Sequence, residues 1–290
     1  MLLKETMRET GLTRKAIDYY IAQNLVQPAV LDNGYRDFGE EDVSRLYKAA
    51  VLRRLGLGTE DIKAVLTDET ETALQALAVR LTLHIRQEQS KKELLGKLGA
   101  GEDYTRIKEA LTALEQGETV AERLLTAFPG YYGRFICLHF ARFLGEPITT
   151  AEQRAAYDDI LTFLDTMPPL RFPADLQAYL VENTSHLGID AINTMLEDTK
   201  RSLENPEQFL AENKEMLTQY LAIKQSEEYK QTPPYRLQAL LKEFNSASGY
   251  YDIFIPAMKR LSPSYAAYIR QMEAANEKLL AAYPEIAGLT

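Results

Sequence analysis

The chain has 290 residues, of which 46% are apolar and 26% are charged. These values are ordinary for globular proteins and exclude a chain that is disordered throughout. Cys137 is the single cysteine, which excludes a disulfide framework and a zinc site made of several cysteines. No stretch is long and apolar enough to cross a membrane, and the chain becomes charged at Lys4 and Glu5, too early for a secretory signal. We therefore expect a soluble protein of the cytoplasm, folded in about two domains.

The formal net charge of −9 argues against a polyanionic partner, but the charge is unevenly distributed. Residues 1–66 contain ten basic and ten acidic side chains, whereas residues 96–290 carry a net charge of −8. An electrically neutral N-terminal segment still permits nucleic-acid binding if its basic residues share one face.

Residues 1–66 are expected to form four short helices and one hairpin. Gly11 ends the first helix, and Thr13 is a good N-cap for the second. Asn33-Gly34 is the strongest short hairpin signal in the chain. The second helix has an apolar stripe and an opposite polar stripe, consisting of Ala16, Ile17, Tyr20 and Ile21 and of Arg14, Lys15, Asp18 and Tyr19. The inner face of the third helix is expected to consist of Val43, Leu46, Tyr47, Ala50 and Leu55.

Residues 69–98 are predicted to form one long dimerisation helix, after an N-terminal domain at 1–68. Apolar residues recur there at steps of three and four, in a seam too narrow for a fully buried helix and suited to a coiled coil. The seam consists of Leu74, Leu77, Leu81 and Ile85. The alternative is that the seam packs against the C-terminal part of the same chain. Glycines at 96, 99 and 101 mark the domain boundary.

Residues 102–290 are predicted to form an all-α domain with roughly eight helices and no strand. Gly117 and Pro129-Gly130 are expected to end its first two helices, and Thr150 to Gln153 has the pattern of a capping box. The expected fold class of the whole chain is therefore mainly α.

The first two helices and the three-residue turn between them meet the requirements of a helix-turn-helix, because the second helix presents polar residues near its N-terminus. The hairpin would form a wing beside it. Five linked motifs resemble the MerR family of bacterial transcription regulators, over about residues 1–95. The motifs lie, in chain order, at residues 11–20, 25–28, 33–36, 40–43 and 54–62.

The resemblance implies a winged helix-turn-helix and a long helix that forms an antiparallel coiled-coil homodimer. It also implies binding to double-stranded DNA at a pseudo-palindromic promoter site, action on RNA polymerase there, and a C-terminal domain that senses a ligand. Carried over by motif, the DNA-binding residues are Thr13, Arg14, Lys15, Tyr19, Tyr35 and Arg36. A pair such as Arg14-Lys15 can also be an ordinary solvated helix face.

The sequence departs from the family pattern at Asp18, where the family usually has arginine, and at Asp37, where it usually has an uncharged residue. Two acids near DNA phosphates weaken non-specific binding. With about eight phosphate contacts per dimer, the salt dependence of binding would have a slope near −7. We therefore predict weak background binding and a strong dependence on the cognate site.

An aromatic run is the candidate effector site in the C-terminal domain, since aromatic walls with a few polar groups are typical of small-molecule pockets. Its residues are Tyr131, Tyr132, Phe135, His139, Arg142 and Phe143. The alternative is that the run is the central core helix. A lone cysteine among apolar residues is usually a small hydrophobic residue, so we expect no metal and no cofactor.

No catalytic residues are predicted, because the sequence has no phosphate-binding loop, no zinc-protease motif and no nucleophile elbow. The expected function is that of a DNA-binding regulator which responds to a small molecule. Two alternatives are a C-terminal domain that binds a protein partner through its acidic, tyrosine-rich face, and a helical domain with an unrecognised catalytic activity.

Overall fold

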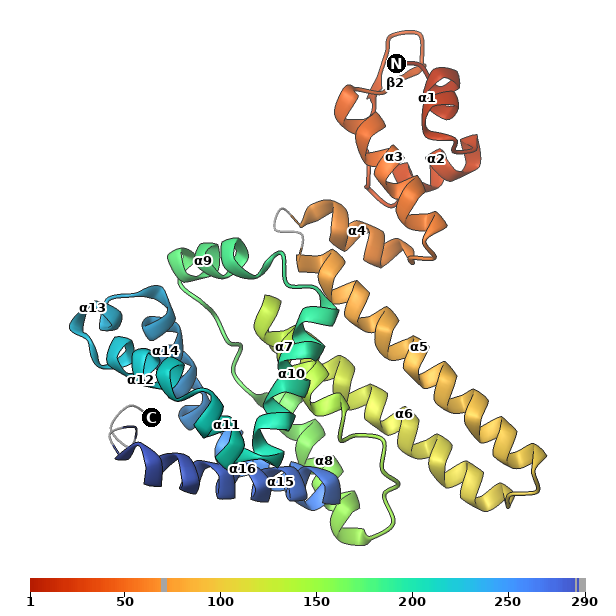
Figure 1. Cartoon of the computed structure of the whole chain (residues 1–290). Helices are drawn as coiled ribbons and strands as arrows, with labels where there is room; N and C mark the ends of the chain where they lie inside the picture. The colour runs from red at the N-terminus through yellow and green to blue at the C-terminus, as the bar shows by residue number, and fades with distance from the viewer. Residues whose placement is uncertain (69–71, 285, 287–290) are drawn as a thin grey trace. The chain divides into compact units, whose positions relative to one another are not determined.

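The computed structural model of the chain describes residues 1–68, 72–284 and 286. Over these residues the structure is helical apart from one two-stranded hairpin (Figure 1), which confirms the expected mainly α fold. The chain divides into two compact units, Met1–Leu77 and Ala78–Thr290. The first residues of the predicted dimerisation helix, 69–71, and the end of the predicted C-terminal domain, 287–290, lie outside the described residues.

The N-terminal unit has its helices and hairpin in the predicted order. They are α1 (Leu3–Thr10), α2 (Arg14–Ala22), β1 (Ala29–Val30), β2 (Arg36–Asp37), α3 (Glu40–Arg54) and α4 (Thr59–Thr67). Gly11 ends α1 in the left-handed conformation, with a φ of 70°, which a glycine adopts without steric cost. The Thr13 hydroxyl accepts a hydrogen bond from the Ala16 amide at 3.2 Å, so the predicted N-cap of α2 is confirmed.

The hairpin pairs β1 and β2 in antiparallel register, with Ala29 opposite Asp37 and Val30 opposite Arg36. The turn is closed by the Leu31 amide, which donates to the Tyr35 carbonyl at 2.8 Å. Gly34 lies in this turn with a φ of 80°. The predicted hairpin is therefore present, with a left-handed glycine at its tip.

One apolar cluster holds this unit together. Its fully buried side chains include Ile17 from α2, Leu46 from α3 and Ile62 from α4. The prediction for α3 was wrong at two positions, because Tyr47 and Leu55 are exposed. The buried face of α3 consists of Val43, Leu46, Ala49 and Leu52. Residues 47, 51 and 55 follow one another at steps of four and form a second, exposed apolar stripe. Periodicity alone therefore does not distinguish the buried face of α3 from the exposed stripe.

Helix α5 (Thr72–Gly99) begins in the first unit and continues in the second. Its residues from 78 onward run antiparallel to α6 (Tyr104–Ala127), which is reached through a turn at Gly101 with a φ of 94° (Figure 1). Val79, Gln87 and Leu94 are buried along one face of α5. The opposite face is exposed at apolar positions.

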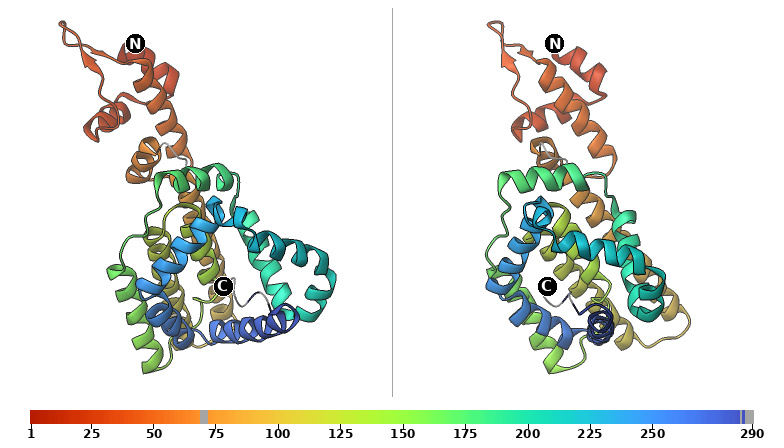
Figure 2. Two further views of the ribbon diagram at one scale, coloured as in Figure 1. Left: turned by 90° about the vertical axis from the view of Figure 1, so that its left-hand side faces the viewer. Right: turned by 60° about the vertical axis from the view of Figure 1, so that its left-hand side comes forward.

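The rest of the C-terminal unit contains more helices than the eight expected, because several are short. They are α7 (Gly130–Ala141), α8 (Ala151–Thr166), α9 (Ala174–Thr184), α10 (Ile189–Glu204), α11 (Pro206–Glu212), α12 (Lys214–Gln225), α13 (Glu227–Lys230), α14 (Pro233–Ala247), the π-helix η1 (Tyr250–Phe254), α15 (Ile255–Leu261) and α16 (Pro263–Ala282). The predicted capping box is present at α8, since the Gln153 amide donates to the Thr150 hydroxyl at 3.1 Å. Helix α16 packs against α10 and α11 (Figure 2). Lys278 of α16 lies 2.8 Å from Glu207 of α11.

Two glycines allow unusually close packing around α6 and α7. A Cβ atom at Gly117 would lie 2.3 Å from the Leu144 carbonyl oxygen, and one at Gly133 would lie 2.0 Å from the Phe128 carbonyl oxygen. Gly117 therefore does not end a helix, as its pattern indicated. It lies within α6 because another backbone occupies the space of a side chain.

Candidate DNA-binding interface

Helix α2 presents its polar stripe to solvent. The Arg14 side chain is 75% exposed, and Lys15 is exposed beside it. The Tyr19 hydroxyl lies 3.1 Å from the Thr59 hydroxyl at the start of α4, so this tyrosine is held against a second helix. The opposite side of α2 anchors the helix through Tyr20, which is core, as its spacing from Ile17 indicated.

The wing presents its two predicted DNA contacts differently. Tyr35 is exposed, whereas the Arg36 side chain is only 39% exposed and turns toward α2. Its guanidinium Nη1 donates a hydrogen bond to Asp18 Oδ1. The structure therefore brings Arg36 to the recognition helix and leaves Tyr35 apart from it.

Asp18 contacts two of the predicted DNA-binding arginines. Besides the bond from Arg36, its Oδ2 lies 3.7 Å from Nε of Arg14, one helical turn earlier. Sequence reasoning identified Asp18 as a departure from the family pattern and missed this pairing. The pair of Arg14 with Asp18 has the i,i+4 spacing of neighbours on a helix, which the sequence signals. The residue spacing offers no signal for the bond from Arg36, because that bond depends on where the wing folds back onto α2.

Asp37, the second departure, has a different partner. Its carboxylate lies 2.6 Å from the amino group of Met1, which also donates to the Phe38 carbonyl at 2.8 Å. The two additional acids are therefore not equivalent, since one is paired with predicted DNA-binding cations and the other with the amino group of Met1.

The predicted dimerisation seam lies on the exposed face of α5. Leu74, Leu81 and Ile85 are exposed, and Leu95 continues the stripe toward the C-terminal end of the helix. Leu77 is half-buried. This stripe lies opposite Val79 and Leu94, so both faces of α5 carry apolar side chains. In the part of the chain that the structure describes, the stripe is the face left exposed.

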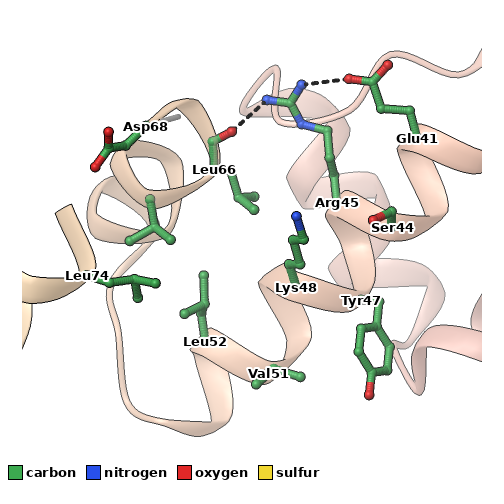
Figure 3. Close-up of a pocket in the computed structure, with 11 residues that line it drawn as sticks. Glu41, Ser44, Arg45, Tyr47, Lys48, Val51, Leu52, Leu66, Asp68 and Leu74 are labelled. Carbon is green, nitrogen blue, oxygen red and sulfur yellow. Dashed lines mark hydrogen bonds and ion pairs between the residues drawn. The ribbon is translucent and has the colours of Figure 1, made fainter. Parts of the chain in front are cut away.

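A groove of about 710 Å³ adjoins the stripe within the N-terminal unit. Figure 3 shows Leu52, Leu66 and Leu74 pointing toward one another across it. At its rim the guanidinium of Arg45 lies 3.5 Å from both Glu41 and the Leu66 carbonyl (Figure 3). Tyr47 and Val51 also line the groove, so the second apolar stripe of α3 is the sequence signal that would have identified it.

The candidate effector residues lie on one side of α7 and pack against different elements. His139 and Phe143 pack against Tyr268 of α16, with ring centroids 5.5 Å and 5.3 Å away. Tyr132 packs edge-on against Phe128. Tyr131 donates to the sulfur of Met195 at 3.6 Å, and Arg142 lies 3.8 Å from Glu197, both in α10. Along α7 the rings of Tyr131, Phe135, His139 and Phe143 contact one another in turn and form a packed row.

Burial is the main cause of the shifted pKa values of two side chains in α7. Desolvation lowers the pKa of His139 to about 4, with a smaller contribution from nearby Arg142. Burial raises the pKa of the Cys137 thiol to about 12, and its Sγ donates to the Ala121 carbonyl at 3.2 Å. A neutral histidine and a protonated thiol are the states expected of core residues.

Within residues 1–68, 72–284 and 286, no group of three or more His, Cys, Asp or Glu side chains is arranged to hold a metal ion. A search of the same part of the chain finds no helix that is both long and apolar enough to cross a membrane.

Comparison with known proteins assigns the N-terminal third. The family model for MerR HTH family regulatory proteins matches residues 1–69. The chain is 32% identical over 122 residues to the HTH-type transcriptional regulator HmrR of Sinorhizobium medicae, covering 41% of this chain and 78% of that protein. It is 30% identical over 122 residues to the heavy metal-dependent transcription regulator 2 of Rhizobium meliloti, with the same coverage.

A further relative is the HTH-type transcriptional regulator CueR of Vibrio cholerae, which is 30% identical over 112 residues, covering 38% of this chain and 76% of that protein. No solved structure matches the chain significantly. The family model ends at residue 69 and does not reach the C-terminal unit. The recognition helix, wing and long helix of the N-terminal region agree with the matches, and the chain belongs to the MerR family of DNA-binding transcription regulators.

Proposed function

We propose that this protein acts as a homodimer, binds a pseudo-palindromic promoter site, and controls RNA polymerase there in response to a small molecule. In this proposal residues 1–68 bind DNA, residues 69–98 dimerise, and residues 102–290 sense the effector. The DNA contacts are Thr13, Arg14, Lys15, Tyr19, Tyr35 and Arg36. The dimer contacts are Leu74, Leu77, Leu81 and Ile85.

The observation that carries the proposal is the uncovered apolar stripe of α5, on a chain whose recognition helix exposes Arg14 and Lys15. A single recognition helix reads only a half-site, and a two-fold dimer reads a palindrome. Exposed apolar stripes at coiled-coil spacing favour a partner helix of the same kind.

The groove beside Leu74 supports a second copy of the chain as the occupant. It adjoins the α5 stripe, and Tyr47 and Val51 supply apolar surface that is not covered within the N-terminal unit. Within the N-terminal unit, Tyr47 and Val51 thus add to the apolar surface at Leu74 that a partner would bury.

An organic effector fits the C-terminal unit better than a metal ion. One relative, from Rhizobium meliloti, is named as a heavy metal-dependent regulator, but the single thiol of this chain is buried with its pKa raised to about 12. A protonated thiol is a poor metal ligand. We retain the aromatic residues around His139 as the candidate effector site.

A second candidate role for this unit is binding of a protein partner. Met216, Tyr220 and Ile223 are exposed at steps of four and three along α12, so they form one apolar stripe. Stripes of this kind mark interaction surfaces. A catalytic role has less support, since the relatives are transcription regulators and the perturbed groups His139 and Cys137 lie in a packed core.

DNA binding is tested by selecting duplexes from a random library with the full-length protein and titrating the selected and random sequences. We expect a two-fold symmetric site and a salt slope near −7, from about eight phosphate contacts per dimer. Replacing Arg14 and Lys15 with alanine should flatten the slope. Little preference for the selected duplex over random DNA would contradict the proposal.

Effector binding is tested by thermal-shift screening of the full-length protein against a library of organic molecules. A ligand at a hundred times its Kd stabilises the native state by about 2.7 kcal/mol. A true effector should also change the affinity for the selected duplex. A broad library without any hit would favour the protein-partner role.

A further inference from the structure

Asp18 lies where the recognition helix and the wing meet. Its Oδ1 accepts a hydrogen bond from the Arg36 guanidinium of β2, and its Oδ2 lies 3.7 Å from Nε of Arg14 on α2. One carboxylate therefore joins two cations that come from different DNA-binding elements. The side chain of Asp18 is 42% exposed, so the arrangement is open to solvent and to an approaching duplex.

The geometry of the carboxylate matches that of a DNA phosphate. Both are anions with more than one acceptor oxygen, and both bind guanidinium groups through charged hydrogen bonds. In the free protein Asp18 thus accepts a charged hydrogen bond from Arg36 and forms an ion pair with Arg14. A backbone phosphate would make contacts of the same kinds in a complex.

The contribution of this cluster to folding stability is small, because ion pairs this exposed contribute little. Its main consequence is that two cations already have an anionic partner before DNA arrives. A phosphate must displace the carboxylate, and it gains less than it would from free arginines.

We propose that Asp18 is a built-in phosphate surrogate that holds down the affinity of the protein for DNA. The proposal rests on the function proposed above. Random DNA, which is held almost only by phosphate contacts, leaves the Asp18 pairs in place. The cognate site holds the recognition helix in one register through base contacts, and there the phosphates displace the carboxylate. Asp18 therefore lowers the affinity for both kinds of DNA. It lowers the affinity for the cognate site at least as much, because its pairs with Arg14 and Arg36 are broken only there.

The test is Asp18→Asn in the full-length protein, measured on selected and random duplexes over a range of salt concentrations. One additional phosphate contact per subunit at 0.15 M salt raises affinity about 5-fold, or about 25-fold per dimer, and steepens the slope by about 2. We expect this gain and the steeper slope on random DNA. On the selected duplex we expect a gain at least as large with an unchanged slope, because the phosphates already displace Asp18 there in the wild type. The matched control is Asp32→Asn, which removes the same charge from the exposed tip of the wing.

A double variant identifies the route of the effect. If Asp18 acts through Arg36, the gain from Asp18→Asn on random DNA should shrink when Arg36 is already alanine. A smaller gain on the selected duplex than on random DNA would overturn the proposal. An equal gain in Asp32→Asn would show that only net charge matters and would overturn it as well. A tenfold loss on the selected duplex would overturn it too, because Asp18 would then position Arg36 for binding.

The same titrations distinguish failure of the proposed function from failure of the Asp18 proposal. A wild-type protein with no preference for the selected duplex would refute site-specific binding by these residues. The effect of Asp18→Asn is measured on random DNA. There the pairing of Asp18 with the two arginines predicts a gain in affinity, whether or not the wild type prefers the selected duplex.

Discussion

The exposed stripe of α5 makes dimerisation the sharpest prediction. Leu74, Leu81, Ile85 and Leu95 are 42%, 56%, 49% and 69% exposed, which together amounts to about two whole leucine side chains per protomer. Fully burying one such side chain contributes about 2 kcal/mol. The stripe alone can thus supply about 8 kcal/mol to a dimer, before the cost of association is subtracted.

The perturbation is Leu81→Glu with Ile85→Glu. Each side chain has about half of its surface left to bury, or about 1 kcal/mol, and the two-fold symmetry doubles the loss to about 4 kcal/mol for the pair. The dimer dissociation constant should therefore rise about a thousandfold. Leu77 is left intact because it is half-buried within its own chain, and changing it would also destabilise the fold.

Sedimentation velocity over a range of concentrations measures the shift from dimer to monomer, and circular dichroism checks that the variant is folded. The matched control is Ile223→Glu, which places the same charge on the exposed stripe of α12. If the double variant stays dimeric at wild-type concentrations, α5 is not the interface. If Ile223→Glu dissociates the protein in its place, the dimer forms through α12.

Three further predictions concern stability, each measured by chemical denaturation. Gly133→Ala should lower the free energy of unfolding by about 1–3 kcal/mol, because its Cβ would lie 2.0 Å from a carbonyl oxygen. The control is Gly96→Ala, whose new Cβ has nothing within 4 Å and should stabilise α5 by about 0.5–1 kcal/mol. Equal effects of the two substitutions would exclude the close approach at Gly133. His139 has a pKa of about 4 when folded and about 6.5 when unfolded, so stability should be full above pH 6.5 and fall by up to about 3 kcal/mol as the pH drops to 4. In His139→Phe this part of the pH dependence should disappear, and an unchanged profile would assign it to other groups. Thr13→Ala should lower the free energy of unfolding by about 1 kcal/mol through loss of the N-cap. Thr13→Ser should lower it much less, because serine keeps the hydroxyl. An alanine variant as stable as the wild type would mean that the hydroxyl does not cap α2.

The N-terminal region could be predicted well from sequence because its signals are local. Thr13 as a cap, Gly11 as a helix end and Asn33-Gly34 as a hairpin each depend on a few adjacent residues, and the structure confirms all three. The family resemblance is confirmed by the matches over residues 1–69. The assignment of individual DNA contacts stays a prediction.

Long-range features could not be predicted in the same way. The pairing of Asp18 with Arg36 depends on the fold of the wing, and Gly117 looked like a helix end because no local signal reveals that the Leu144 backbone would pass beside it. Tyr47 and Leu55 were misassigned since a helix with two apolar stripes has no unique inner face by periodicity alone. The aromatic run has an equally ambiguous pattern, and its residues have several different neighbours.

The single sulfhydryl provides the protein with an internal reporter. Cys137 is fully buried in α7, so a thiol-reactive dye has no thiolate to attack while the surrounding helices stay closed. Labelling kinetics of the unmodified chain would therefore measure how often the C-terminal unit opens. An effector that stabilises the closed C-terminal unit would slow the labelling, whatever the chemical class of the effector. No engineered probe would be needed.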